Sequence, residues 1–135
     1  STSIKYITNW SDFEKYLHSD SMQLYRYSWT ADMPDPDNFL RPLFATDSTV
    51  NFGDYTNPEI DYLIKDAASM IDDVERAQLY QKIEKNIMLE HPIIPLLYLS
   101  IDRVYHSKVR GIQSSPLGWQ AVRLHRTWFE PQLSQ

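Results

Sequence analysis

Residues 29–40 read Trp-Thr-Ala-Asp-Met-Pro-Asp-Pro-Asp-Asn-Phe-Leu, and this stretch is the most informative part of the chain about its fold. It follows a strand-like run. Pro34 and Pro36 exclude a regular helix and favour extended backbone before them. We therefore expect Trp29 and Asp32 to lie on a rigid loop at the end of a strand, where a flat apolar wall stands beside a fixed negative charge. Such a loop suits a ligand with an ammonium group; the alternative is a Pro-rich surface turn with a core tryptophan.

Sequence patterns predict short helices on both sides of this loop and a longer helix after it. Ser11 and Glu14 form a capping box that opens a helix ending near His18. Residues 39–44 form a short helix or turn packed on the core. Asn57-Pro58 begins a longer helix, with Asn as cap and Pro at the first position. Its apolar stripe consists of Ile60, Leu63, Ile64, Ala67, Ala68 and Ile71.

A further helix follows after a very short connection, so the two long helices should form an antiparallel pair. Asp72-Asp73-Val74-Glu75 caps it, and His91-Pro92 stops it after Glu90. Its apolar positions are Val74, Leu79, Tyr80, Ile83 and Ile87. We assign no chemistry to this pair.

Strands are predicted before the loop and after the helix pair. Gln23–Trp29 alternates, Ile93–Ser100 reads as a short buried strand, and residues 120–129 form a last strand after a turn at Gly111. Mixed helices and strands without regular alternation indicate an α/β or α+β fold, and periodicity does not separate the two.

Composition narrows the function classes. The 135 residues carry a net charge of −5 with dispersed basic residues, which argues against a nucleic-acid partner. Only residues 123–126 form a local basic group, which we interpret as a solvated strand edge. No apolar run reaches the length of a membrane span. The absence of cysteine excludes disulfides and thiolate metal sites.

The loop resembles the W-x-A-D-x-x-D-P-x-x-F-L signature of the bacterial extracellular solute-binding proteins of family 5, the oligopeptide- and dipeptide-binding receptors of ABC importers. The similarity continues in order from about Trp10 to Gly118, nearly the whole chain. It includes Asn51, Tyr55, Asn57-Pro58-Glu59-Ile60-Asp61, Arg76, Leu79-Tyr80-Gln81-Lys82-Ile83-Glu84, Pro92-Ile93-Ile94-Pro95-Leu96-Leu97-Tyr98 and Val109-Arg110-Gly111.

The resemblance implies a C-terminal fragment of a periplasmic-binding-protein type II-like bilobal fold. We expect residues 1–9 to be a cloning remnant and the start of the fragment, residues 10–118 a portion of the C-terminal lobe, and residues 119–135 a segment returning toward the other lobe. The complete protein would bind oligopeptides or dipeptides for uptake, dock to ABC permease subunits, and be periplasmic or lipid-anchored in the cell envelope.

Site residues follow from the same resemblance. Asp32 would receive the ligand's α-amino group through a charge-assisted hydrogen bond. Trp29 and Trp10 would be pocket walls, or else ordinary core aromatics. Arg26 corresponds to a basic position near the ligand's carboxylate; on a strand it would lie on the face opposite Trp29, and the alternative is a solvent-facing arginine. The remaining expected ligand neighbours, near the returning strand, are Tyr98 and Arg103.

We expect no catalytic residues, no metal site and no cofactor. The four histidines lack metal-ligand spacing, and no phosphate loop or nucleophile constellation stands out. An enzyme is therefore not expected. Two alternatives stay open: the same fold with non-peptide cargo (a nickel chelate, haem, an oligosaccharide or an opine), and a small helical protein-interaction module.

Overall fold

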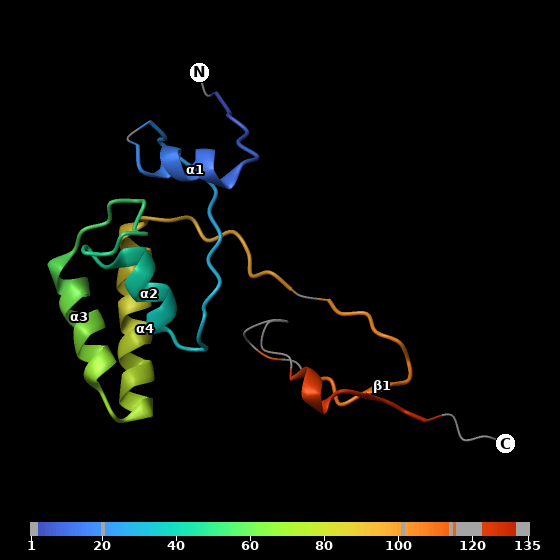
Figure 1. Cartoon of the computed structure of the whole chain (residues 1–135). Coiled ribbons are helices and arrows are strands. Elements are labelled where there is room, and N and C mark those ends of the chain that lie inside the picture. The colour runs from blue at the N-terminus through green and yellow to red at the C-terminus, as the bar shows by residue number, and fades with distance from the viewer. Residues whose placement is uncertain (1–2, 20, 101, 114, 116–122, 132–135) are drawn as a thin grey trace.

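The computed structural model describes residues 3–19, 21–100, 102–113, 115 and 123–131. In chain order its elements are α1 (Trp10–Leu17), α2 (Asp37–Phe44), α3 (Pro58–Ser69), α4 (Asp73–Glu90), β1 (Val109–Arg110), the 3₁₀ helix η2 (Leu124–Arg126) and β2 (Trp128–Phe129), as Figure 1 shows. β1 and β2 pair antiparallel, with Val109 opposite Phe129. The mixed helix-and-strand class is confirmed.

Local capping chemistry explains where the two long helices begin. The Asn57 side chain accepts hydrogen bonds from the amides of Glu59 and Ile60, at 3.0 and 3.2 Å. Asp72 does the same for the amides of the first turn of α4. Both satisfy backbone donors that a helix leaves unpaired. These predicted starts are confirmed, as is the end of α4, where His91 adopts a left-handed conformation with φ of 56°.

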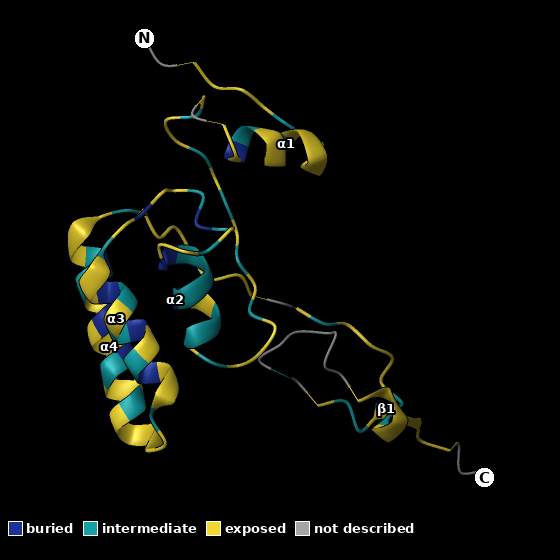
Figure 2. Cartoon of the chain, turned by 60° about the vertical axis from the view of Figure 1, so that its left-hand side comes forward, coloured by how far each residue is buried: buried dark blue, intermediate teal, exposed yellow. Residues whose placement is uncertain are grey.

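The core lies between α3 and α4, with α2 packed against them (Figure 2). Four isoleucines are the largest fully buried side chains: Ile60, Ile64, Ile83 and Ile87. They recur at helical spacing on the facing sides of α3 and α4. Phe44 of α2 and Tyr55 close the core with an edge-to-face ring contact, 5.9 Å between centroids.

The predicted stripes were too long at the connection between the two helices. Ala68 is exposed, Ile71 is 97% exposed, and Val74 is also exposed. Ile71 lies in the connection, outside both helices, whereas Ala68 and Val74 lie at the adjoining ends of α3 and α4, on sides that do not face the core. The cap of α1 was also misplaced: Asn9, rather than Ser11, accepts the amide hydrogen bonds.

The predicted strands before the loop and after α4 do not form as sheet members in the described residues. Residues 24–31 are extended and their burial alternates with period two, so the predicted faces are present without a paired neighbour. Residues 93–100, expected to be buried, are extended and exposed. A strand needs hydrogen-bonding partners as well as alternation, and the sequence pattern does not supply them.

Of the last predicted strand, residues 120–129, only Trp128–Phe129 forms a strand in the described residues. Residues 120–122 lie outside the described residues, residues 124–126 form η2, and β2 follows. The expected basic strand edge is therefore a solvent-exposed 3₁₀ turn. Gly111 follows β1 in a left-handed conformation with φ of 80°. The turn next to β1 lies before it, at residues 107–108, where the Val109 amide donates to the His106 carbonyl.

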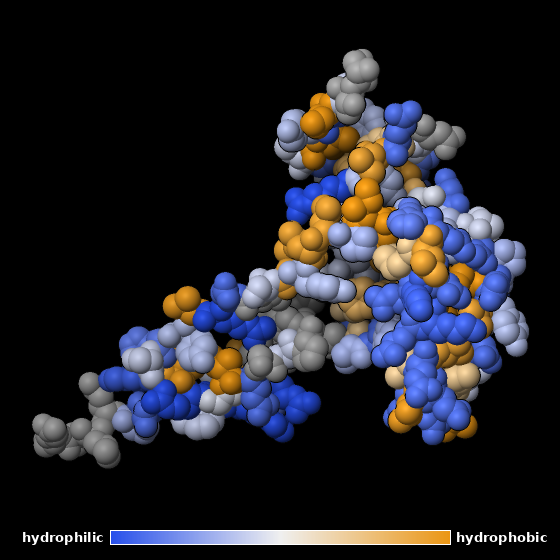
Figure 3. Space-filling view, turned by 180° about the vertical axis from the view of Figure 1, so that it is seen from behind, coloured by the Kyte–Doolittle hydropathy of each residue, from blue (hydrophilic) through white to orange (hydrophobic). Residues whose placement is uncertain are grey.

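The chain exposes far more surface than a compact protein of its size. Its accessible surface is 11401 Å² for 16.0 kDa. A compact monomer of that mass has roughly 7,400 Å². Large apolar side chains contribute to the excess, including those of Leu24 and residues 93–99, and Figure 3 shows apolar residues gathered on the surface.

Candidate ligand-binding site

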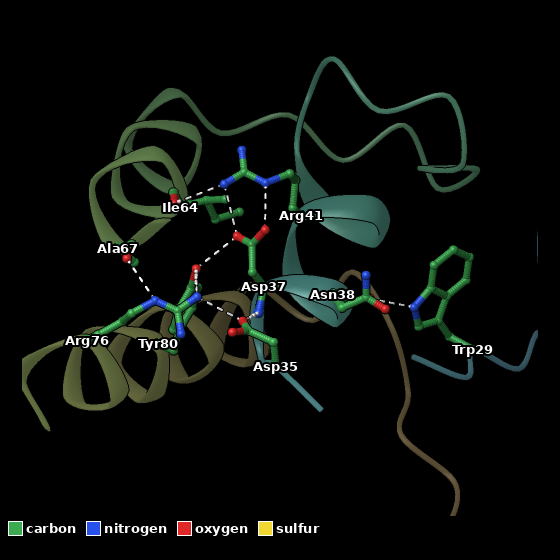
Figure 4. Close-up of polar contacts among 9 residues, drawn as sticks. All are labelled: Trp29, Asp35, Asp37, Asn38, Arg41, Ile64, Ala67, Arg76 and Tyr80. Carbon is green, nitrogen blue, oxygen red and sulfur yellow. Dashed lines mark hydrogen bonds and ion pairs between the residues drawn. The ribbon is translucent and has the colours of Figure 1, made fainter. Parts of the chain in front are cut away.

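The loop between the extended segment and α2 is held by one residue of the helix. The backbone carbonyl of Asn38 accepts a hydrogen bond from Trp29 Nε1 at 2.7 Å. The Asn38 side-chain oxygen accepts the Asp32 amide, also at 2.7 Å. Asn38 lies in the first turn of α2. Trp29 and Asp32, the two residues that the sequence singled out, are therefore both bonded to Asn38. Figure 4 shows the contact between Trp29 and Asn38.

Two of the three acids in this loop are neutralised by arginines. Arg76 Nη2 lies 2.9 Å from Asp35 Oδ1. Arg41 makes two hydrogen bonds to Asp37, at 2.8 and 2.9 Å. Asp35 also makes a local turn contact, since its Oδ1 accepts the Asp37 amide at 2.8 Å. The arginine contacts are an additional function of these acids that the sequence pattern did not indicate.

These contacts perturb the groups that make them. The hydrogen bond from Arg76 holds the pKa of Asp35 below its ordinary value, against the opposing effect of burial. The same bond raises the pKa of Arg76. Tyr80 donates to Asp37 Oδ1 at 2.9 Å. Burial, followed by this hydrogen bond, raises the pKa of Tyr80 to about 12.

Asp32 differs from both neighbouring acids. Its side chain is exposed. Among the residues that the structure describes, its carboxylate has no hydrogen-bonding or ion-pair partner, although its amide is held by Asn38. The loop thus presents one carboxylate without a partner among the described residues, on a backbone that the hydrogen bond to Asn38 holds in place. Such a group can receive an ammonium group.

Aromatic rings line the extended segment that leads to Asp32. Tyr27 lies 6.4 Å from both Trp10 and Trp29, measured between ring centroids. Phe52 contacts Tyr27 edge-on at 5.5 Å. The structure therefore brings together the predicted wall residues and adds Tyr27 and Phe52. The shared face of Tyr27 and Trp29 was visible in the alternation, whereas Phe52 had no signal in the sequence.

The other predicted site residues lie elsewhere. Arg26 is exposed on the face opposite Tyr27 and Trp29, as strand alternation requires. Tyr98 is 97% exposed on the extended segment after α4. Arg103 is partly buried, and its Nη1 has no hydrogen-bond partner among the described residues. In the described part of the chain, no hydrogen bond, ion pair or ring contact joins these three residues to the Asp32 loop.

A second set of polar contacts joins the start of α3 to the end of α4. Tyr55 donates to Glu90 at 2.8 Å, and Asn57 Nδ2 donates to the same carboxylate at 2.7 Å. Burial and the Glu90 hydrogen bond raise the pKa of Tyr55 to about 12. These contacts fix the start of α3 against the end of α4.

Metal chemistry and membrane insertion receive no support from the described residues. Within them no group of three or more histidine and acidic side chains could hold a metal ion. No helix in that part of the chain is long and apolar enough to cross a bilayer.

No family model matches the sequence. Over 114 residues the chain is 29% identical to Heme-binding protein A of Haemophilus influenzae, which covers 83% of this chain and 21% of that protein. Over 102 residues it is 33% identical to the periplasmic oligopeptide-binding protein OppA of Salmonella typhimurium, covering 76% and 19% respectively. The structure of HbpA2 from Haemophilus parasuis matches with a TM-score of 0.73 at 27% identity, over 90% of this chain and 24% of that one.

This chain is homologous to the family 5 solute-binding proteins over most of its length. The resemblance drawn from the loop signature is confirmed. The chain spans about a fifth of the length of the curated relatives it matches. Those relatives are binding or transport proteins.

Proposed function

We propose that the chain is part of the substrate-binding component of an ABC importer, and that it holds the amino terminus of a peptide at Asp32. The observation that carries this proposal is the free carboxylate of Asp32, on a loop whose other two acids are paired. An unpaired carboxylate on a loop that Asn38 also ties to Trp29 can receive an ammonium group followed by apolar atoms. Recognition of a peptide's end, rather than its side chains, suits a carrier of many sequences.

The aromatic rings support the same assignment. Trp10, Tyr27 and Trp29 give a wall of ring faces and edges along the segment that leads to Asp32. Rings of this kind bury much apolar area and fix orientation through geometry. A peptide bound with its amino group at Asp32 would lay its first side chains along this wall.

The large exposed surface supports a role as one part of a larger body. The chain exposes 11401 Å², which is roughly 4,000 Å² more than a compact monomer of this mass. Extended segments with unpaired backbone and exposed apolar side chains favour covering by the rest of a two-lobed protein. This argues against a self-contained helical module. In the proposal the complete protein lies in the periplasm or is anchored at the cell envelope, and docks to permease subunits.

The second candidate cargo is haem, because a relative that covers 83% of this chain bears the name Heme-binding protein A. The two cargoes make opposite demands on Asp32. A peptide ammonium needs the carboxylate, whereas binding of the haem ring system depends chiefly on apolar walls and an iron ligand.

Substitution of Asp32 by asparagine tests the proposal. Calorimetric titration of the complete binding protein with trialanine should give an affinity at least about 30-fold weaker in Asp32→Asn, because a charged partner of the ammonium is lost. Asp47→Asn, a matched change of an exposed acid in the loop after α2, should leave the affinity unchanged. N-acetylated trialanine should bind the unsubstituted protein as weakly as trialanine binds the variant.

Equal trialanine affinity in the Asp32→Asn and unsubstituted proteins would refute the assignment of Asp32. Tight hemin binding that survives Asp32→Asn, with no trialanine binding in either protein, would replace the peptide with haem as cargo.

A further inference from the structure

Arg76 lies at the point where three parts of the structure meet. It belongs to the first turns of α4. Its Nε donates to the carbonyl of Ala67 near the end of α3 at 3.2 Å, and its Nη2 donates to Asp35 at 2.9 Å. Nη2 also lies 3.3 Å from the hydroxyl of Tyr80, whose ring the guanidinium covers at 4.8 Å from the centroid. Contacts with Ala67 and Tyr80 therefore hold the guanidinium in place independently of its bond to the loop.

Arg76 lies on the helix pair that contains the most deeply buried side chains among the described residues. Ile64 and Ala67 of α3 and Ile83 of α4 are fully buried in the same helix pair. A close-packed pair of helices has little freedom to shift. A side chain tied to both helices can thus serve as a fixed reference point for a loop that lies against them.

A continuous series of short contacts leads from Arg76 to the free carboxylate. Asp35 receives Arg76 and also accepts the Asp37 amide at 2.8 Å, which sets the start of α2. Asn38 follows in the same turn and holds both Asp32 and Trp29 at 2.7 Å. Figure 4 shows Arg76, Asp35 and Asn38 in one band along the loop. Every step is a hydrogen bond except the peptide bond between Asp37 and Asn38, so direction as well as position is transmitted.

We infer that Arg76 is a positioning residue for the ligand: by neutralising Asp35 it fixes the loop in the one arrangement that leaves Asp32 unpaired and holds both Asp32 and Trp29 on Asn38. Without Arg76, Asp35 would be an uncompensated acid three residues from Asp32. It would repel that carboxylate and would compete with it for an incoming ammonium group. Because Asp35 and Asp37 are neutralised, Asp32 is the one acid of the three that is left to bind an ammonium group. The consequence for a ligand rests on the proposed function, whereas the consequence for the loop does not.

Hydrogen–deuterium exchange by mass spectrometry tests the effect on the loop without any ligand. The variants are Arg76→Gln, which removes the guanidinium, and Asp35→Asn, which keeps an oxygen for the Asp37 amide but removes the charge. In both, amides of residues 30–38 should exchange about tenfold faster, as expected for loss of one charge-assisted bond. Amides in the middle of α4 should keep their protection.

Arg110→Gln is the matched control, because it removes an arginine–glutamate ion pair with Glu130 far from the loop. It should leave exchange in residues 30–38 unchanged. Unchanged exchange in both Arg76→Gln and Asp35→Asn would overturn the inference. Faster exchange throughout α3 and α4, to the same extent as in the loop, would also overturn it, since Arg76 would then support the whole helix pair.

Trialanine titration of the complete binding protein gives the second readout. Arg76→Gln should weaken binding about tenfold, and Arg110→Gln should not change it. Unchanged affinity in Arg76→Gln, with binding present in the unsubstituted protein, would contradict the positioning function. If the unsubstituted protein binds no trialanine, the proposed function fails, and the exchange rates still decide whether Arg76 orders the loop.

Discussion

Replacing Tyr80 with phenylalanine removes one buried oxygen and leaves every charged group beside it with another partner. The Tyr80 side chain is 2% exposed. Its hydroxyl donates to Asp37 at 2.9 Å and lies 3.3 Å from Arg76 Nη2. Asp37 keeps its two bonds from Arg41. Arg76 keeps Asp35 and the carbonyl of Ala67.

The expected cost follows from this arrangement. A hydrogen bond to a charged group contributes roughly 1.5–3 kcal/mol to stability. The low end applies, because the ring stays in place and no charge is left unpaired. We expect Tyr80→Phe to lower the free energy of unfolding by about 1.5–2 kcal/mol. The urea midpoint measured by far-UV circular dichroism should fall by roughly 1 M for a chain of this size.

The fall in the free energy of unfolding at alkaline pH gives an independent test of the Tyr80 contacts. Tyr80 has its pKa raised from 10.0 to about 12 in the folded protein. The folded state therefore holds this proton more tightly than the unfolded state. Its contribution is complete below pH 10 and is lost as the pH rises through 12, since the unfolded chain ionises first. Tyr55 behaves in the same way, and burial also raises the pKa values of Tyr25 and Tyr27. Tyr80→Phe should therefore remove part of the alkaline loss and leave the remainder.

Tyr62→Phe is the control for this prediction. Tyr62 lies on α3 with its side chain 67% exposed. Its substitution should change the free energy of unfolding by less than about 0.5 kcal/mol. If Tyr80→Phe changes stability no more than Tyr62→Phe, or leaves the fall at alkaline pH unchanged, the contacts of the Tyr80 hydroxyl do not stabilise the fold as argued.

The remaining predictions concern packing and backbone geometry. Ile64→Ala should destabilise the helix pair by about 2–5 kcal/mol in urea unfolding, because the side chain is fully buried; a cost no greater than that of Ile71→Ala, at a 97% exposed position, would contradict the core assignment. Gly111→Ala should abolish the β1–β2 cross-strand contacts seen by NMR, because φ is 80° and a Cβ would collide with the Arg126 carbonyl. Gly53→Ala, whose Cβ would lie 3.9 Å from its nearest neighbour, should leave them intact.

Helix boundaries were predictable from the sequence because their causes are local. Asn57, Pro58 and Asp72 act on backbone groups two or three residues away. His91 and Pro92 end α4 in the same local way. The failures occurred where the outcome depends on distant segments. Residues 93–100 have the composition of a buried strand and yet are exposed, because neither burial nor pairing of a strand is encoded within it.

In the candidate site, too, the features with local causes were predictable from the sequence, and those that depend on distant residues were not. The sequence identified the loop, because prolines and acids at short spacing have few structural alternatives. It also placed Trp29 and Tyr27 on one face. What it did not show is how the charges are distributed within the loop. Three acids occur within six residues, and by composition alone each could receive a ligand's ammonium group.

Partners contributed by the fold decide which of these acids is free. Asp37 is paired with Arg41, four residues away in α2, and an i, i+4 pair of this kind can be recognised in a sequence. Asp35 is paired with Arg76, a residue 41 positions away that only the packing of α4 brings to the loop. Asp32 therefore differs from Asp35 through a contact that no spacing rule describes. For this reason the selectivity of the site is a property of the helix pair beneath the loop as much as of the loop itself, and a change at Arg76 should alter ligand binding without touching the ligand.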